Sequence, residues 1–319
     1  MKVLLWHVHG SWTTSFVQGG HSYVVPLTPE RCADGRGRAR TFPWPASVRE
    51  VPWDMLGNEQ VDLVVLQRPH EAELVHRWLG RHPGTDLPAV YVEHNTPAGD
   101  VPATRHPMAD RDDIPLVHVT HFNHLMWDSG RACSYVIEHG VRDPGHRYTG
   151  ALPRAAVVVN EPVRRNRVTG TDLLAAFAAK TPLDIFGMKV TGLPYNTFDD
   201  LPQHMMHEKL AQRRVYLHPY RWTSLGLALI EAMMLGMPVV ALATTEAVEA
   251  IPPGAGVLST CVPTLVDALA AFATDSALAA EVGAEARAAA LAHFGLSRFL
   301  DDWDRLLTTL VPDAAQRSL

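Results

Sequence analysis

The segment from Tyr216 to Ala241 carries the residues best suited to hold a phosphorylated ligand. A strand runs into a loop, and the apolar run after the loop predicts a helix that ends at Gly236. The residues around the expected helix start are Thr223, Ser224, Leu225 and Gly226. Backbone N–H groups at a helix start attract phosphate. Glu231 is one acid among Leu, Ile, Ala and Met, so its burial requires a polar partner, for which a ribose diol is suitable.

A basic loop is the second group of residues that could do chemistry. Arg164, Arg165 and Arg167 lie between an apolar strand and a helix, and Gly170 precedes that helix. Guanidinium groups match the geometry of phosphate oxygens, and a helix start favours anions. The loop therefore predicts a cationic pocket for a diphosphate. A solvated basic turn is the simpler alternative.

Polar residues also follow two strands in the first half of the chain. His94 follows the apolar run Ala89–Glu93, where it could bind a sugar hydroxyl or stabilise charge. The small, polar loop expected over residues 9–21 follows the first strand, and its Gly19 and Gly20 would let backbone N–H groups approach a phosphate or a sugar. The alternatives are a histidine that satisfies loop carbonyls and an ordinary glycine turn. The loop lacks the G-x-G-x-x-G dinucleotide fingerprint.

Short, continuous apolar runs alternate with helical patterns along the chain, as in Val61–Leu66, Glu71–Leu79 and Ala89–Glu93. Strands buried on both faces have such sequences, and their alternation with helices predicts parallel, doubly wound α/β sheets. The Gly- and Pro-rich stretch 138–154 interrupts the pattern, so we place one domain at 1–150 and a second at 151–295. An apolar stripe at helical spacing predicts a final helix within 296–319. The Ala-rich segment before it is expected to form surface helices.

The composition is typical of a two-domain α/β protein. The chain has 319 residues, of which 47% are hydrophobic, and its net charge is −6. No Lys/Arg block interleaved with aromatic residues occurs, so nucleic acid is not an expected partner. The three cysteines are far apart, which is typical of a reduced, cytoplasmic chain. No apolar stretch approaches the roughly 20 residues of a membrane span, which leaves peripheral membrane contact open.

A run of histidines raises the question of a metal site. His118, His121 and His124 are spaced three residues apart. However, Val117 and Val119 indicate a strand there, and no acidic ligand shares the pattern. We therefore predict no metal site.

The second half of the segment 216–241 resembles a known signature. Residues 231–240 read Glu-Ala-Met-Met-Leu-Gly-Met-Pro-Val-Val, which is similar to the end of the E-x7-E…A-M-x-x-G-x-P-V-V pattern of the family 4 retaining glycosyltransferases of the GT-B fold. The basic loop, His94 and the sequence His139-Gly140-Val141 also occur in the order of that family. The resemblance implies that Glu231 takes the ribose hydroxyls of a donor nucleotide and that His94 contacts the donor sugar. The N–H groups around Ser224–Gly226 would then meet the sugar and the phosphate.

Two positions depart from the family pattern. Thr223 stands where the family has its first glutamate, eight residues before Glu231, and Thr169 stands where the family has a lysine that grips the diphosphate. Arg164, Arg165 or Arg167 could replace that lysine. A threonine at position 223 leaves three alternatives: an unusual donor sugar, a replacement group from elsewhere in the chain, or lost activity.

The resemblance implies a GT-B fold of two Rossmann-like domains that face one another across a cleft, with the last helix packing back on the first domain. It also implies a sugar transferase that moves a sugar from a nucleoside diphosphate sugar to an acceptor hydroxyl with retention of configuration, and without a metal or other cofactor. The acceptor class, whether glycan, lipid-linked or small molecule, and the oligomeric state stay open. Two alternatives remain: a catalytically silent GT-B protein that binds a nucleotide sugar or acts as a partner subunit, and an epimerase or phosphorylase of the same fold.

Overall fold

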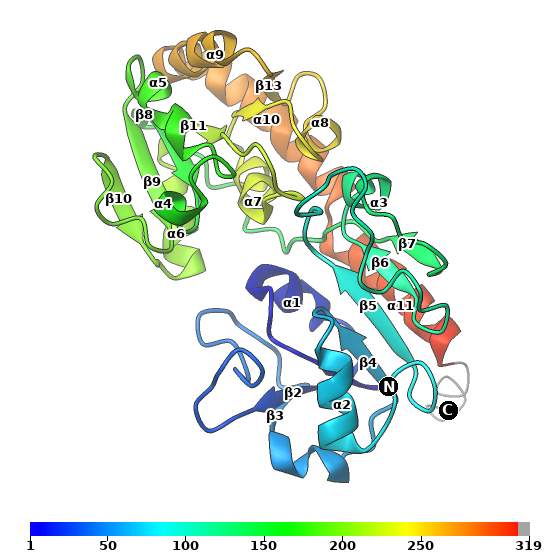
Figure 1. The fold of residues 1–319 in the computed structure, drawn as a ribbon. Coiled ribbons are helices and arrows are strands. Elements are labelled where there is room, and N and C mark those ends of the chain that lie inside the picture. The colour runs from blue at the N-terminus through cyan, green and yellow to red at the C-terminus, as the bar shows by residue number, and fades with distance from the viewer. Residues whose placement is uncertain (312–319) are drawn as a thin grey trace. The chain divides into compact units, whose positions relative to one another are not determined.

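The structure, a computed structural model, describes residues 1–311, and the chain divides into two compact units. The first unit comprises Met1–Gly140 together with helix α11 (Leu296–Leu310), and the second comprises Val141–Gly295. Each unit contains one parallel sheet with helices packed beside it (Figure 1). The parallel α/β architecture expected from the sequence is therefore confirmed in both units.

The sheet of the first unit has seven strands in the order β3-β2-β1-β4-β5-β6-β7, and every neighbouring pair is parallel. The strands are β1 (Lys2–Leu5), β2 (Ser22–Leu27), β3 (Val48–Pro52), β4 (Leu63–Leu66), β5 (Ala89–Glu93), β6 (Leu116–His118) and β7 (Ser134–Val136). Its helices before α11 are α1 (Gly10–Phe16), η1 (Trp53–Asn58), α2 (Glu71–Leu79) and α3 (His121–Met126). The strand order reverses between β1 and β4, and the carboxyl ends at such a reversal form the usual ligand site of these sheets.

The sheet of the second unit has six parallel strands in the order β10-β9-β8-β11-β12-β13. The strands are β8 (Leu152–Val158), β9 (Leu183–Gly187), β10 (Asn196–Asp199), β11 (Arg213–His218), β12 (Val239–Leu242) and β13 (Gly256–Ser259). The helices are α4 (Pro162–Arg165), η2 (Thr171–Leu173), α5 (Leu174–Ala178), α6 (Gln203–Leu210), α7 (Leu227–Leu235), α8 (Ala247–Ala250), α9 (Val262–Thr274) and α10 (Ser276–His293). Here the reversal lies between β8 and β11.

Burial explains which strands the sequence reveals. Every residue of β4, β5 and β12 is buried, and these strands have the continuous apolar sequences expected of strands covered on both faces. β10 and β13 form the edges of the second sheet and are half-buried or exposed, so their sequences carry no apolar run. The sequence of β2 contains a proline, and that of β3 contains charged residues, so neither has a continuous apolar run. These four strands are not apparent from the sequence.

The junction between the units lies earlier in the chain than the sequence indicates. The division falls between Gly140 and Val141, not after residue 150. The N–H of Val141 already donates to the carbonyl of Phe294, at 2.9 Å. The N–H of Thr149 donates to a carbonyl next to β11, that of Ala211, also at 2.9 Å. Stretch 141–150 belongs to the second unit because its backbone bonds there, although it has no strand pattern.

The last helix packs on the first unit, as expected. In α11, Trp303 lies edge-on to Trp12 and Phe16 of α1, with ring centroids 5.7 and 5.1 Å apart. Phe299 approaches Gly140 so closely that a Cβ on this glycine would lie 2.1 Å from the Cβ of Phe299. The remainder of the expected C-terminal segment, residues 312–319, lies outside the described residues.

The Ala-rich segment forms α9 and α10, which are more buried than expected of surface helices. In α9, Leu265, Leu269 and Phe272 are buried against the second sheet. In α10 the buried residues are small, and at Gly283 the helix meets the end of α7: a Cβ there would lie 2.1 Å from the carbonyl oxygen of Gly236. The small side chains thus permit close helix packing.

Across residues 1–311, no helix combines the length and the apolar character that crossing a bilayer requires.

Candidate functional site

Glu231 lies in the middle of α7 and is only 3% exposed. Its Oε1 accepts a hydrogen bond from Nε2 of Gln203 at 2.9 Å, and its Oε2 lies 3.1 Å from Nε2 of His207. Both partners come from α6, so the protein itself provides the polar partners that a buried carboxylate needs. Each carboxylate oxygen has two lone pairs and can accept another hydrogen bond from a hydroxyl.

The loop between β11 and α7 brings the expected helix-start residues over the end of β11. Ser224 and Leu225 are buried, and Thr223 is half-buried. Gly226 is the N-cap of α7, and a Cβ on it would lie 2.9 Å from Cε1 of His218. This close approach requires glycine. Because His218 ends β11, the first N–H groups of α7 lie at the carboxyl edge of the sheet.

A column of three rings at the end of β11 was not expected from the sequence. The ring of His218 stacks against Tyr216 and Tyr220, with centroids 6.2 and 4.8 Å away. Burial lowers the pKa of His218 to about 3, and its Nδ1 has no hydrogen-bond partner within residues 1–311. The signal that could have revealed this column is the spacing of two, which places the three side chains on one face of an extended chain.

Two of the three arginines of the basic loop are already paired, which corrects the expectation that all three form a cationic pocket. Nε of Arg164 donates to Glu161 at 2.9 Å, and Nη1 of Arg167 lies 3.4 Å from Oδ2 of Asp172. Lys189 after β9 also contacts Glu161, at 2.6 Å. Arg164 and Lys189 together lower the pKa of Glu161 to about 2. Side-chain carboxylates therefore engage Arg164 and Arg167, although Asp172 is shared with Arg221 and Glu161 with Lys189.

Arg165 is held differently. Its guanidinium lies over the ring of Tyr220, 5.8 Å from the centroid, and the structure shows no carboxylate partner for it among residues 1–311. The lysine position of the family pattern is occupied by the fully buried Thr169, whose hydroxyl donates to the carbonyl of Asn166 at 3.1 Å. Gly170 has a positive φ of 70°, and a Cβ there would lie 1.9 Å from a backbone oxygen. The turn is thus closed tightly around a neutral side chain.

In the first unit, His94 lies at the carboxyl end of β5, as expected, but inside the protein. Its ring stacks on His9 with centroids 4.0 Å apart and lies edge-on to Trp12 at 5.0 Å. Burial holds its pKa well below the usual value, and the charges of His9 and His139 act in the same direction. Its Nε2 is buried and has no hydrogen-bond partner within the described chain. His94 is therefore a neutral imidazole with one free nitrogen.

His9 and His139 complete this histidine cluster. Neither was predicted from the sequence to be a site residue. Burial lowers the pKa of His9 to about 4 and that of His139 to about 3. Nη2 of Arg298 in α11 donates to the carbonyl of His139 at 2.6 Å. The last helix thereby supports the histidine cluster.

Gly19 and Gly20 do not lie at this edge of the sheet, which is a correction. Residues 10–16 form α1 instead of a loop, and the two glycines connect α1 to the amino end of β2. Because β1 and β2 are parallel, the amino end of β2 lies at the edge opposite to His94. The prediction failed because the helix between the strand and the glycines was not recognised.

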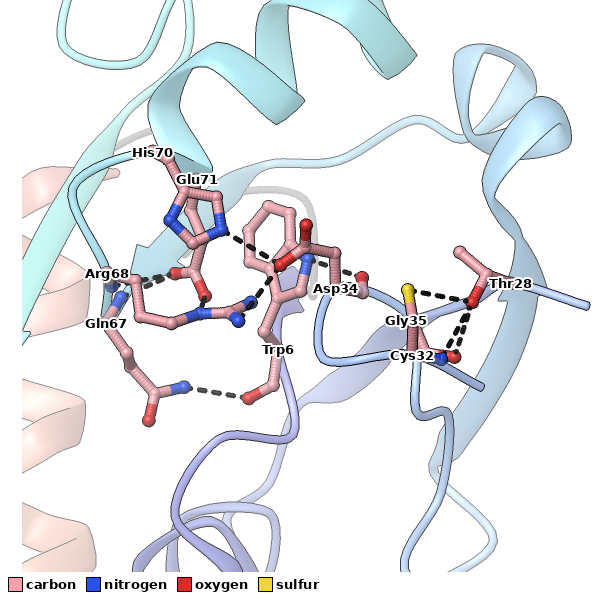
Figure 2. A network of polar contacts seen from close by, with 9 residues as sticks. All are labelled: Trp6, Thr28, Cys32, Asp34, Gly35, Gln67, Arg68, His70 and Glu71. Atoms are coloured by element: carbon pink, nitrogen blue, oxygen red, sulfur yellow. Dashed lines mark hydrogen bonds and ion pairs between the residues drawn. The ribbon is translucent and has the colours of Figure 1, made fainter. Parts of the chain in front are cut away.

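A polar network follows β4 at the same edge as His94 (Figure 2). Glu71, at the start of α2, accepts from the N–H of Gln67 at 2.7 Å and from Nε of Arg68 at 2.7 Å. Nη1 of Arg68 also contacts Asp34, at 3.0 Å. Nε2 of Gln67 donates to the carbonyl of Trp6 after β1, at 2.8 Å. The network therefore ties the ends of β1 and β4 to the loop that contains Asp34.

The histidines near α3 make hydrogen bonds to serine. Nε2 of His118 lies 3.1 Å from Oγ of Ser129, and Nε2 of His124 lies 3.2 Å from Oγ of Ser134. Within residues 1–311 no group of three or more His, Cys, Asp or Glu side chains could hold a metal ion.

Comparison with protein families identifies the region around α7. Residues 187–275 match the family model "Glycosyl transferases group 1". This region contains Gln203, His207, Thr223 and Glu231. No curated protein matches the chain significantly in sequence.

Solved structures resemble the whole chain. Sucrose-phosphate synthase from Thermosynechococcus elongatus is 14% identical, with a TM-score of 0.71 over 97% of this chain and 99% of that one. HepE from Anabaena in complex with UDP-glucose is also 14% identical, with a TM-score of 0.67 over 97% and 100%. TarM from S. aureus, 15% identical, has a TM-score of 0.61 over 76% of this chain, which spans only 55% of TarM. The family match shows that residues 187–275 are similar to the group 1 glycosyltransferases, and the solved structures together with the two parallel sheets show that the chain has the GT-B fold.

Proposed function

We propose that the protein transfers a sugar from a nucleoside diphosphate sugar to an acceptor hydroxyl, with retention of configuration at the anomeric carbon. Glu231 is the observation that carries this proposal. It is a buried carboxylate inside the matched region, oriented through both oxygens by Gln203 and His207 and still able to accept hydrogen bonds. A ribose diol supplies two adjacent hydroxyl donors for these oxygens. The solved HepE complex contains UDP-glucose, which makes UDP the first nucleotide to test.

The diphosphate is assigned to the start of α7 and to Arg165. At the start of α7 the N–H of Leu229 donates back to the carbonyl of Gly226 at 2.9 Å, whereas the N–H groups of Leu227 and Ala228 precede the first bonds of the helix and favour negative charge. Arg165 is the arginine of the basic loop that no carboxylate neutralises in the described part of the chain. It replaces the cation that Thr169 does not supply.

The reaction requires one bond exchange at the anomeric carbon. The acceptor oxygen forms a bond to this carbon while the bond to the diphosphate oxygen breaks. The acceptor proton passes to a phosphate oxygen of the leaving group on the same face, which gives retention. N–H groups and a guanidinium placed at the diphosphate stabilise the charge that develops there. His94, neutral near pH 7 and with a free nitrogen, is assigned to a hydroxyl of the donor sugar.

Thr223 favours a second candidate, a GT-B protein that binds the nucleotide sugar without turnover. The half-buried threonine holds no charge where the family pattern has a carboxylate. UDP binding by calorimetry and hydrolysis of UDP-sugars should therefore be measured separately. Tight UDP binding without turnover on any tested donor and acceptor would favour the silent protein over the transferase.

Two matched variants test the diphosphate assignment. Arg165→Gln should weaken UDP binding more than uridine binding, because uridine lacks the diphosphate. The double variant Arg164→Ala with Arg165→Ala should do the same. Arg164→Gln alone is the control, since Arg164 is engaged by Glu161. Equal losses for UDP and uridine in Arg165→Gln would contradict the assignment.

The cytoplasm is the proposed location. The three cysteines, Cys32, Cys133 and Cys261, are all free and exposed, which suits a reducing compartment.

A further inference from the structure

The loop between β2 and β3, residues 28–47, is held firmly at the carboxyl end of β1. The N–H of Thr28 donates to the carbonyl of Gly35 at 2.9 Å, so the loop begins as a tight hairpin. Nε1 of Trp6 donates to the carbonyl of Asp34 at 3.0 Å. Nδ1 of His7 lies 3.2 Å from the carbonyl oxygen of Gly37. These contacts fix the backbone on both sides of position 36.

Arg36 is the cation that this hairpin presents. Its backbone forms a bridge to Leu27, and its carbonyl accepts from Nη1 of Arg31 at 2.9 Å. Its own side chain is exposed and has no carboxylate partner among residues 1–311. Burial is the main cause that lowers the pKa of His7 and of His9, and the positive charge of Arg36 lowers both further. The backbone on both sides of Arg36 is held at the end of β1 by Trp6 and His7, so the charge of Arg36 acts at this edge of the sheet.

The acidic residues nearby are already engaged. Asp34 contacts Arg68 at 3.0 Å and His70 at 2.9 Å. Glu93 contacts His106 at 2.9 Å. The loop 28–47 contains four arginines and two acidic residues, a net charge of +2, in a chain whose net charge is −6. Positive charge is thus concentrated at this edge of the first sheet and is left without compensation at Arg36.

Besides Nε2 of His94, which is assigned to the donor sugar, two buried polar atoms at the same edge lack hydrogen-bond partners within the described chain: Oε1 of Gln67 and Nη2 of Arg68. In Figure 2 the free amide oxygen of Gln67 points away from the network that holds its amide nitrogen. Buried polar groups nearly always have partners, so these atoms indicate a ligand with hydroxyl groups. They include both a donor and an acceptor, as a polyol requires.

We propose that the acceptor is an anionic sugar or polyol, whose carboxylate or phosphate binds Arg36 beside His9 and whose hydroxyls reach Gln67 and Arg68. This inference rests on the proposed transferase function and specifies its acceptor. Arg36 is suited to the role because a guanidinium binds carboxylate and phosphate through paired hydrogen bonds. The hairpin fixes the backbone of Arg36 before the ligand binds, so only the side chain has to be ordered.

Binding of small probes tests the proposal directly. Glucose 6-phosphate and glycerol 3-phosphate test phosphate, glucuronate tests carboxylate, and glucose and glycerol serve as neutral counterparts, all followed by ligand-observed NMR. At least one anionic probe should bind at least tenfold more tightly than its neutral counterpart, and Arg36→Gln should remove about tenfold of that affinity. Arg40→Gln is the matched control, because Arg40 is an exposed arginine of the same loop whose charge is not among the causes that lower the pKa of His7 and His9.

Equal binding of charged and neutral probes, or equal losses in Arg36→Gln and Arg40→Gln, would overturn the proposal. Preference for phosphate over carboxylate probes would assign the anion as phosphate, and the reverse would assign it as carboxylate. Gln67→Met should weaken binding of the anionic probe, whereas Gln18→Met should leave it unchanged. Gln18 is the control because its side chain also donates to a backbone carbonyl, that of Thr14 in α1.

The imidazole of His9 offers a readout that does not depend on activity. Arg36→Gln should raise the pKa of His9 above its value of about 4, because one of its lowering charges is removed. A bound anion should raise it in the wild-type protein. Unchanged titration of His9 in both experiments would contradict the placement of Arg36. UDP binding is measured in parallel to separate this outcome from a failure of the transferase proposal. Binding of anionic probes without binding of UDP would contradict only the transferase proposal.

Discussion

Glu71 in the first unit and Glu231 in the second are both buried carboxylates on helices, yet their surroundings differ. Glu71 is completely buried at the start of α2 and accepts from two backbone N–H groups and from the guanidinium of Arg68. Burial raises its pKa, against the lowering effect of these donors. Glu231 accepts hydrogen bonds from the side chains of Gln203 and His207. One carboxylate has a charged partner and several donors, and the other has two side-chain donors.

This difference separates a structural acid from a candidate binding acid. Three donors, one of them cationic, use most of the hydrogen-bonding capacity of Glu71, so it holds the loop after β4 in place. Glu231 has an orientation set by α6 and capacity left for a ligand. Burial of an acid thus does not by itself mark a site, whereas its unused hydrogen-bonding capacity does.

The largest expected effect is on folding, from Glu71→Ala. Removing this carboxylate leaves Arg68 without its buried partner, and we expect a loss of about 3 kcal/mol in the free energy of unfolding, measured by urea denaturation. The control is Glu73→Ala on the same helix, whose exposed pair with Arg77 contributes little. Equal losses of stability in the two variants would contradict the structural role of Glu71.

The next effect is on ligand binding, from Glu231→Ala. Loss of the charge-assisted hydrogen bonds to a ribose diol should cost about 2 kcal/mol, or roughly 30-fold in UDP affinity by calorimetry. Glu71→Gln should leave UDP affinity unchanged in the folded protein. UDP binding of normal strength in Glu231→Ala would show that this acid, too, is structural.

A smaller effect concerns pH, because each unit buries a neutral histidine. The folded pKa of His139 and of His218 is about 3, below the unfolded value of about 6.5. The unfolded state therefore binds more protons, and stability present above pH 6.5 is lost as the pH falls towards 3. Between pH 7 and pH 5, each histidine should lower the free energy of unfolding by on the order of 2 kcal/mol.

Denaturation of His139→Gln and His218→Gln at these two pH values checks this prediction. Each variant should show a shallower loss of stability than the wild type on acidification. His204→Gln, an exposed histidine of α6, should keep the wild-type slope. Equal slopes in all three variants would contradict the assignment of buried neutral histidines.

The smallest effect is expected for Gln203→Met. This change removes one donor to Glu231 at similar side-chain volume and should lower UDP affinity by about 1 kcal/mol, or a few-fold. Calorimetry with Gln212→Met as the control would measure it. No change in UDP affinity would mean that α6 does not orient Glu231 for the ligand.

The sequence was informative where one local pattern decides the structure. The bounds of α2 follow from helical periodicity, because one face of this helix is buried. Those of α7 and β5 follow from continuous apolar runs, because these elements are buried nearly all round. It was misleading about the basic loop, whose arginines suggested a pocket. Glu161 and Asp172 engage two of these arginines, and each carboxylate also binds a cation from farther along the chain, Lys189 or Arg221. Stretch 141–150 has no pattern, and only its backbone hydrogen bonds assign it to the second unit.

By itself, the sequence determined the two parallel sheets, the final helix and the position of Glu231 within a glycosyltransferase signature. These follow from hydrophobic periodicity and from local motifs, which act over a few turns of chain. Only the tertiary structure decided which charges remain free: Arg165 over Tyr220, Arg36 on its hairpin, and Glu231 held by α6. The physical reason is that the reactivity of a charged side chain depends on desolvation and on partners distant in sequence, which no local pattern specifies.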